Sequence, residues 1–143
     1  MGRYKDPEAA DALIAVIEDE NRFVRVEIVH SLIEIGDPRA VDPLISLLGD
    51  KYYRVRQSAA YSLGIFGDRR AVDPILNALE TEREAEVRNS QVNALGELGG
   101  PEAIEGLRRI STDMEEYGYV RTAAEEALGK IEGGGEANVS SSS

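Results

Sequence analysis

The feature that most constrains the fold is a segment that occurs twice in the chain. GDPRAVDP begins at Gly36 and GDRRAVDP begins at Gly67, so seven of eight residues are identical at an offset of 31 residues. Extending this match in both directions gives four units, at residues 6–36, 37–67, 68–99 and 100–132. A fixed period of this length is typical of repeat proteins, in which similar units stack on one another.

Each unit has the pattern of two helices. The first half, such as DPRAVDPLISLL, begins with an N-cap Asp and a Pro suited to the first helical position. In the second half, such as RVRQSAAYSLGIFG, apolar residues recur on one helical face, counted from the Val of Val-Arg at 0, +4, +8 and +11. Pro43 and Pro74 predict a bend just past the first turn of their helices. The residues expected to end the second helices are Gly36, Gly67, Gly99 and, one residue late, Gly133.

Stacking follows from the size of the units. One helix pair cannot bury its own apolar face, whereas stacked copies cover one another. The sequence therefore predicts an all-α fold, an α-solenoid of four stacked helix pairs. We expect residues 1–5 to be a lead-in and residues 133–143 to be a disordered Gly/Ser tail, which has no apolar anchor. Glu125 replaces the small apolar residue of the other units, so we expect the stack to end at unit 4.

The repeated residues resemble the HEAT-like repeat family, in the short form found in phycobilisome lyase subunits. The resemblance covers residues 6–132 and lies in Asp-x-Arg-Ala-Val-Asp-Pro-Leu of the first helix and Val-Arg-x-x-Ala-Ala-x-x-Leu-Gly of the second. It implies a HEAT/armadillo-like superhelix. It also implies a structural ladder of acidic and arginine side chains that joins loops and neighbouring units. The residues at the repeated acidic and arginine positions are Asp11, Asp42, Asp73 and Glu105, and Arg25, Arg56, Arg88 and Arg121.

Composition excludes several classes of function. The formal charge is −11, from 16 basic and 27 acidic residues, so the surface repels nucleic-acid phosphates and favours a basic partner. The absence of Cys excludes a disulfide scaffold and a thiolate zinc site, and fits a reducing cytoplasm. No apolar run approaches the roughly 18 residues of a membrane span. We therefore expect a cytoplasmic monomer that contacts neither nucleic acid nor membrane.

The sequence has no recognisable catalytic constellation. His30 is the only His, and its spacing from carboxylates and hydroxyls suggests no catalytic triad. Some HEAT-like proteins are di-iron hydroxylases that use His-Glu pairs, and this chain has no such pair. The acidic stretch at Glu82, Glu84 and Glu86 lacks the alternating Asp/Asn ligands and Gly of a calcium loop. We expect no enzymatic activity, no catalytic residue, no metal and no cofactor.

A second stripe on the second helices does not repeat. It lies at −1, +2, +3, +6 and +10 from the same Val, opposite the core stripe, and stacking would align it into one surface. The family resemblance places this surface on the concave side. Apolar and aromatic residues there add nothing to the stack, and such side chains dominate protein interfaces. The predicted partner-binding residues are Phe23, Val26, His30, Arg54, Gln57, Tyr61, Ile65, Asn89, Asn93, Tyr119 and Glu126.

Three functions are consistent with this pattern. The first is a non-catalytic module that binds a protein or peptide on the second-helix surface. The alternative is an accessory subunit of a heteromeric enzyme, such as a chromophore-lyase-like complex. The third, an element that stacks end to end, is disfavoured by the charge at Glu125.

Overall fold

In the part of the chain that the structure describes, all regular secondary structure is helical. The computed structural model describes residues 7–142, with side chains for residues 7–133, so the predicted lead-in lies outside the described residues. The α-helices are α1 (Pro7–Ala15), α2 (Arg22–Ile35), α3 (Val41–Ser46), α4 (Tyr53–Phe66), α5 (Val72–Thr81), α6 (Ala85–Leu98), α7 (Pro101–Thr112) and α8 (Gly118–Ser142). Short 3₁₀ helices flank α3 and precede α5, namely η1 (Pro38–Ala40), η2 (Leu47–Gly49) and η3 (Arg69–Ala71).

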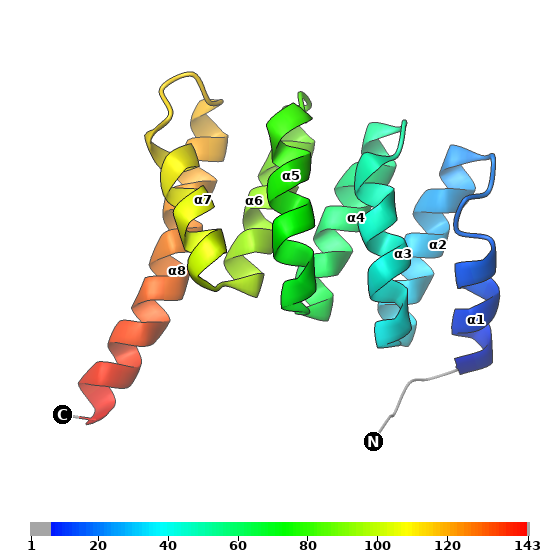
Figure 1. Cartoon of the computed structure of the whole chain (residues 1–143), viewed down its shortest axis with the longest axis horizontal. Helices are drawn as coiled ribbons and strands as arrows, with labels where there is room; N and C mark the ends of the chain where they lie inside the picture. Colours follow the sequence, from blue (N-terminus) through cyan, green and yellow to red (C-terminus); the bar gives the residue numbers. More distant parts are fainter. Residues whose placement is uncertain (1–6, 143) are drawn as a thin grey trace.

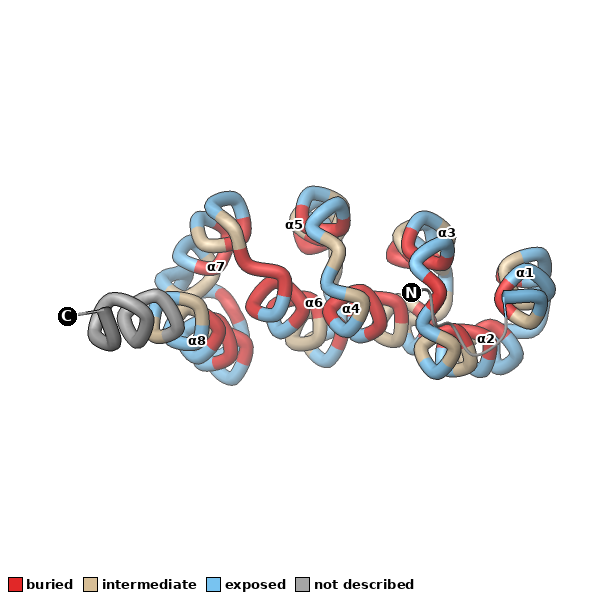
Figure 2. Tube along the Cα trace, turned by 90° about the horizontal axis from the view of Figure 1, so that it is seen from below, coloured by how far each residue is buried: buried red, intermediate tan, exposed pale blue. Residues whose placement is uncertain are grey.

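The helices are arranged in two parallel rows. Helices α1, α3, α5 and α7 form one row, and α2, α4, α6 and α8 form the other (Figure 1). Figure 2 shows that the slab bends gently, with the second row on the inner side of the curve. We call these the outer row and the inner row. The predicted α-solenoid of four helix pairs is confirmed.

The core lies between the two rows and between successive units. Leu44, Leu63, Leu95 and Leu107 are fully buried there. The core stripe predicted for the second helices begins with a buried Val in units 2 to 4. In unit 1 the equivalent Val24 is 39% exposed, because no described helix covers that side of α2.

The exposure of Glu125 matches the break in the repeat seen in the sequence. Val29, Ala60 and Val92, which occupy the same position in units 1 to 3, are completely buried. Glu125 is exposed on α8. Within the described residues, therefore, the apolar contact that joins successive units stops at this helix.

Local chemistry accounts for most helix ends. The Asn21 side chain accepts hydrogen bonds from the first turn of α2, and Asp37 and Asp68 cap η1 and η3 in the same way. Gly36 and Gly67 end α2 and α4 in the left-handed conformation, with φ of 76° and 71°, as predicted.

Two local predictions differ from the structure. Pro43 and Pro74 do not follow a first α-helical turn, because that turn is a separate 3₁₀ helix and each proline lies in the first turn of the α-helix that follows. An N–H group has no intrahelical partner there, so its loss costs little. Gly133 does not end α8, which continues to Ser142, and it is not among the described glycines with positive φ. The predicted disordered tail falls mostly on residues whose side chains lie outside the described part.

Glycine sets the spacing of the inner row. A Cβ atom added to Gly64 would lie 3.1 Å from Ala94 Cα, and one added to Gly96 would lie 2.8 Å from Ala127 Cβ. Both distances are shorter than ordinary contacts, so glycine permits the close approach of α4, α6 and α8. Unit 1 has Ile33 at the equivalent position, and α2 packs less closely on α4 than α4 packs on α6.

Candidate functional site

The looser seam between α2 and α4 opens as a groove on the inner face. Its volume is about 370 Å³, and it is open to solvent. The lining side chains come from α2, α4 and α6 and are Val26, His30, Arg54, Gln57, Ser58, Tyr61 and Ser90. All seven belong to the stripe that does not repeat. We call this site the inner groove.

The lining combines apolar surface with hydrogen-bonding groups. Val26 is half-buried and packs against the core, whereas Tyr61 is 59% exposed. Ser58 and Ser90 are small and half-buried. Arg54 and His30 are the basic residues of the lining, which has no Asp or Glu. Such a surface can hold an extended segment by its backbone and accept one apolar side chain.

Beside the groove, aromatic and arginine side chains stack into a ridge. The ring centroids of Phe23 and Tyr52 lie 6.0 Å apart, and those of Tyr52 and Tyr53 lie 5.5 Å apart, both edge to face. The guanidinium carbon of Arg22 lies 4.6 Å from the centroid of Tyr52, and that of Arg54 lies 5.3 Å from the centroid of Tyr53. These distances are typical of cation–π contacts. We call Arg22, Phe23, Tyr52, Tyr53 and Arg54 the aromatic ridge. Arg54 belongs to both the aromatic ridge and the inner groove.

The structure brings together about half of the predicted partner-binding residues. Five of them line the inner groove, and Phe23 lies on the aromatic ridge. The others occupy the inner row but do not line this groove, namely Ile65, Asn89, Asn93, Tyr119 and Glu126. The prediction omitted Ser58, Ser90, Tyr52 and Tyr53. A signal for the serines exists in the sequence, because they are small residues at a position where unit 1 has Glu27.

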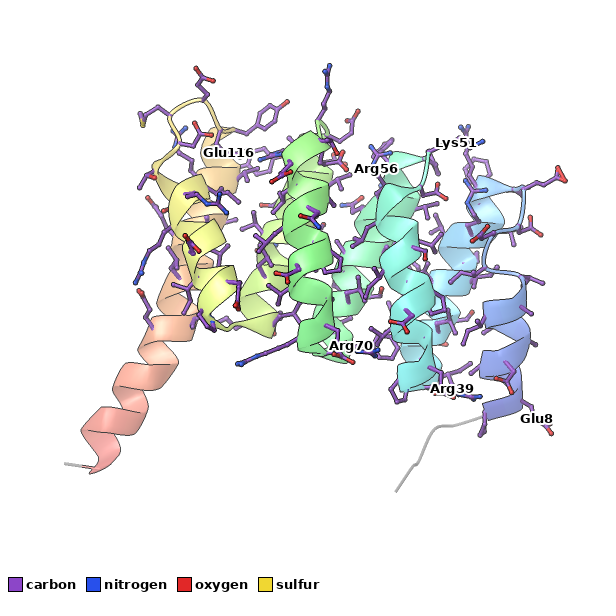
Figure 3. All side chains as sticks on the ribbon, in the orientation of Figure 1. Glu8, Arg39, Lys51, Arg56, Arg70 and Glu116 are labelled. Carbon is purple, nitrogen blue, oxygen red and sulfur yellow. The ribbon has the colours of Figure 1, made fainter. Side chains whose placement is uncertain are left out.

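Ion pairs join neighbouring units at the loop end of the helices. Each participating inner-row arginine pairs at 2.7–2.8 Å with a carboxylate in the loop that follows the next unit's outer helix. These pairs are Arg25 to Asp50, Arg56 to Glu82 and Arg88 to Glu116. Arg56 and Glu116 mark this end of the molecule in Figure 3. The same arginines also donate to backbone carbonyls of the loop that precedes their own helix. Arg121 donates to the carbonyl of Glu116 at 2.7 Å.

A second set of ion pairs lies at the opposite end, where Figure 3 shows Arg39 and Arg70. The pairs across units are Arg39 to Asp11 at 2.7 Å and Arg70 to Asp42 at 3.3 Å. Ion pairs therefore join neighbouring units, as the predicted ladder requires. The repeated aspartates and the repeated arginines belong to two separate sets of pairs, however, and do not bind each other. The outer-helix aspartates and the inner-helix arginines lie at opposite ends, so they cannot pair with each other. Asp73 has no ion pair among the described residues.

The arginines of this second set of ion pairs also lower the pKa of two carboxyl groups. Hydrogen bonds from Arg39 hold the pKa of Asp37 below its ordinary value, although burial of Asp37 opposes this. Arg70 lowers the pKa of Asp68 in the same way. Both carboxylates are N-caps as well as ion-pair partners, so their charge stabilises the start of the outer helices.

The sequence of the chain matches a known family of repeat proteins. A family model described as HEAT repeats matches residues 1–64 and 41–129. The chain belongs to the HEAT-repeat family. Its HEAT repeats are the four helix pairs described above, and the inner row holds the second helix of each repeat.

Solved structures of other HEAT-repeat proteins are similar in fold. A chain in the complex of CpcE and CpcF of phycocyanin lyase from Nostoc sp. PCC7120 matches with a TM-score of 0.76 and 27% identity, over 89% of this chain and 54% of that one. Human deoxyhypusine hydroxylase in complex with glycerol matches with a TM-score of 0.74 and 26% identity, over 87% of this chain and 44% of that one. This HEAT-repeat chain thus spans about half the length of each matched chain. No curated protein matches it in sequence.

The described HEAT repeats also bear on two other classes of site. Among residues 7–133, no group of three or more His, Cys, Asp or Glu side chains is placed to hold a metal ion. None of the described helices is both long enough and apolar enough to cross a bilayer.

Proposed function

We propose that the protein is a non-catalytic scaffold that binds a protein or peptide segment at the inner groove. One observation supports this most strongly. Within the described residues, the outer-row helices have no large exposed apolar side chain, whereas the inner row has Phe23, Tyr61, Ile65 and Tyr119, each more than half exposed. These side chains do not stabilise the stack, and clustered exposed apolar groups mark interaction sites. The lack of Cys suits such a scaffold to a reducing cytoplasm.

A second candidate function is an accessory subunit of a heteromeric enzyme. The similarity to a chain from the complex of CpcE and CpcF favours it, because that lyase is an assembly of two proteins. The inner face would then bind a partner subunit permanently. We do not propose hydroxylase activity from the other match, since the sequence has one His and no His-Glu pair.

Site-specific photo-cross-linking in cells of the source organism tests the proposal. The variant Tyr61→p-benzoylphenylalanine places the reactive group on the inner groove. The matched control places it at Glu80, which is exposed on α5 of the outer row. We expect a discrete covalent adduct from position 61 and none from position 80. No adduct at 61, or equal adducts at both positions, would contradict binding at the groove, whereas an adduct with an enzyme subunit would favour the second candidate.

A further inference from the structure

We infer that the inner groove binds an acidic peptide segment, in which a carboxylate engages Arg54 and a neighbouring apolar side chain packs against Val26 and Tyr61. This inference rests on the proposed binding function and adds the chemistry of the ligand. It differs from the expectation drawn from net charge, which favours a basic partner. The local charges of the groove, rather than the average charge of the protein, decide what binds there.

The lining of the inner groove is depleted of acid. The chain has 27 acidic residues and 16 basic ones, yet none of the seven lining residues is Asp or Glu. Glu27 is close in sequence to the lining residue Val26, but it lines a separate hollow with Leu13 and Val24 on the other side of α2. A basic segment in the inner groove would find no carboxylate in the lining and would face Arg54.

Arg54, like Arg22 of the aromatic ridge, is held by an aromatic ring, whereas three other inner-row arginines are held by a carboxylate. Arg25, Arg56 and Arg88 each donate to a carboxylate of the next unit. Arg54 stacks on Tyr53 and has no ion pair with any described residue. Stacking occupies the face of a guanidinium and leaves its N–H edge available, which matches the two oxygens of a carboxylate.

The aromatic ridge extends this positive surface. Arg22 lies over the rings of both Phe23 and Tyr52, at 5.1 and 4.6 Å, and has no ion pair among the described residues. A ligand with two or more carboxylates could therefore bind Arg54 and continue toward Arg22. Two arginines are too few to hold a nucleic acid against a net charge of −11, so an acidic protein segment fits better.

The remaining lining groups suit a peptide backbone. Gln57, Ser58 and Ser90 can donate and accept hydrogen bonds at the groove floor. Val26 and Tyr61 provide the apolar contact that one side chain of the ligand would cover. An acidic segment with an aromatic or aliphatic residue next to a carboxylate would thus use every part of the lining except His30.

Selection from a phage-displayed random peptide library on the full chain tests the inference. We expect the selected peptides to be enriched in Asp and Glu next to an apolar residue. A synthetic selected peptide, measured by fluorescence anisotropy, should bind Arg54→Gln at least about tenfold more weakly, the scale of a lost charge-assisted hydrogen bond. Its affinity should also fall as salt is raised. The matched control is Arg109→Gln, an exposed arginine of the outer row, which should change affinity less than about twofold.

The outcomes separate this inference from the proposed function. Basic or uncharged peptides whose binding is lost in Tyr61→Ala would overturn the acidic ligand and leave the groove as a binding site. Acidic peptides that bind Arg54→Gln as tightly as wild type would also overturn it. If wild-type protein selects no peptide at all, both the ligand and the proposed peptide-binding function fail. Circular dichroism of each variant confirms that the fold is retained.

Discussion

Arg56 of α4 donates its Nε to Oε1 of Glu82 at 2.7 Å and its Nη2 to Oε2 at 3.0 Å. Its third nitrogen donates to the carbonyl oxygen of Asp50 at 2.8 Å. One side chain therefore closes the loop before its own helix and joins the next HEAT repeat. The hydrogen bond with Glu82 is the main reason that the pKa of Arg56 is raised above its ordinary value. The same arrangement recurs at Arg25 and Arg88, so it is a general joint of this solenoid.

Breaking this joint should destabilise the fold. Glu82 has only 3% of its side chain exposed, so Arg56→Leu would leave a buried carboxylate without its partner. We expect the free energy of unfolding in urea to fall by about 3 kcal/mol. The control is Arg108→Leu, whose partner Glu132 is well exposed, and it should cost less than about 1 kcal/mol. Equal losses of unfolding free energy in the two variants would show that the buried ion pair stabilises the fold no more than the exposed one.

The close spacing of the inner-row helices predicts that a Gly→Ala substitution has opposite effects on stability at Gly96 and at the equivalent Gly129. Gly96→Ala would force a methyl group to within 2.8 Å of Ala127 Cβ, so we expect a loss of about 1–3 kcal/mol. Gly129 occupies the same position in the last repeat, and nothing lies within 4 Å of a Cβ there. Gly129→Ala should therefore stabilise the protein by up to about 1 kcal/mol through helix propensity. Thermal unfolding of both variants checks the sign, and a stabilised Gly96→Ala would exclude the proposed close packing.

The repeat made most of the fold predictable from sequence. Helix pairs, most caps and the core stripe depend on residues close together in the chain, such as Asp37 with Pro38 and Gly67 after α4. These signals occur in nearly every unit, so the helix boundaries predicted in one unit support those predicted in the others. The end of α8 was not predictable in this way, because a glycine can also lie within a helix, as Gly133 does without a positive φ.

The ion pairs and the groove depend on distances between units, which sequence spacing does not give. Arg25, Arg56 and Arg88 share one position, but their partners are one Asp and two Glu in loops of different length. The inner groove depends on how α2, α4 and α6 pack against one another. Sequence periodicity identified the side of the second helices that faces away from the core. Which residues on that side line the inner groove is decided by the packing of neighbouring units.

Gln91 is a buried polar residue whose replacement should stabilise the protein. It lies on the core stripe of α6 with no exposed surface, and neither its Nε2 nor its Oε1 has a hydrogen-bond partner among the described residues. Unpaired buried amides typically cost about 1–3 kcal/mol. Gln91→Leu should therefore raise the melting temperature, whereas Gln57→Leu, in the half-buried groove lining, should change it little. A marked loss of stability in Gln91→Leu would mean that the amide is paired in solution.

The acid stability of the protein should depend on Asp37. Because Arg39 lowers the pKa of Asp37 in the folded state, its charge stabilises the fold above the ordinary carboxyl pKa of about 4 and ceases to do so as the pH falls below the folded-state value. Asp37→Asn retains an acceptor for the backbone N–H of Arg39 but removes the charge. The melting temperature of the variant should be lower than that of wild type at neutral pH, and the difference should shrink in acid. A difference that is constant with pH would assign the effect to the cap alone.

Binding at the inner groove is tested most directly by measuring affinity and stability together for Tyr61→Ala. The ring is 59% exposed and belongs to no described core contact, so the free energy of unfolding should change by no more than about 0.5 kcal/mol. The matched control is Tyr117→Ala, an exposed tyrosine of the loop before α8, which should leave affinity unchanged. For a peptide selected on the wild-type protein, Tyr61→Ala should weaken binding roughly thirtyfold, the scale of one lost interface anchor. A loss of several kcal/mol in stability with the affinity intact would instead assign Tyr61 to the core and contradict a binding site at the inner groove.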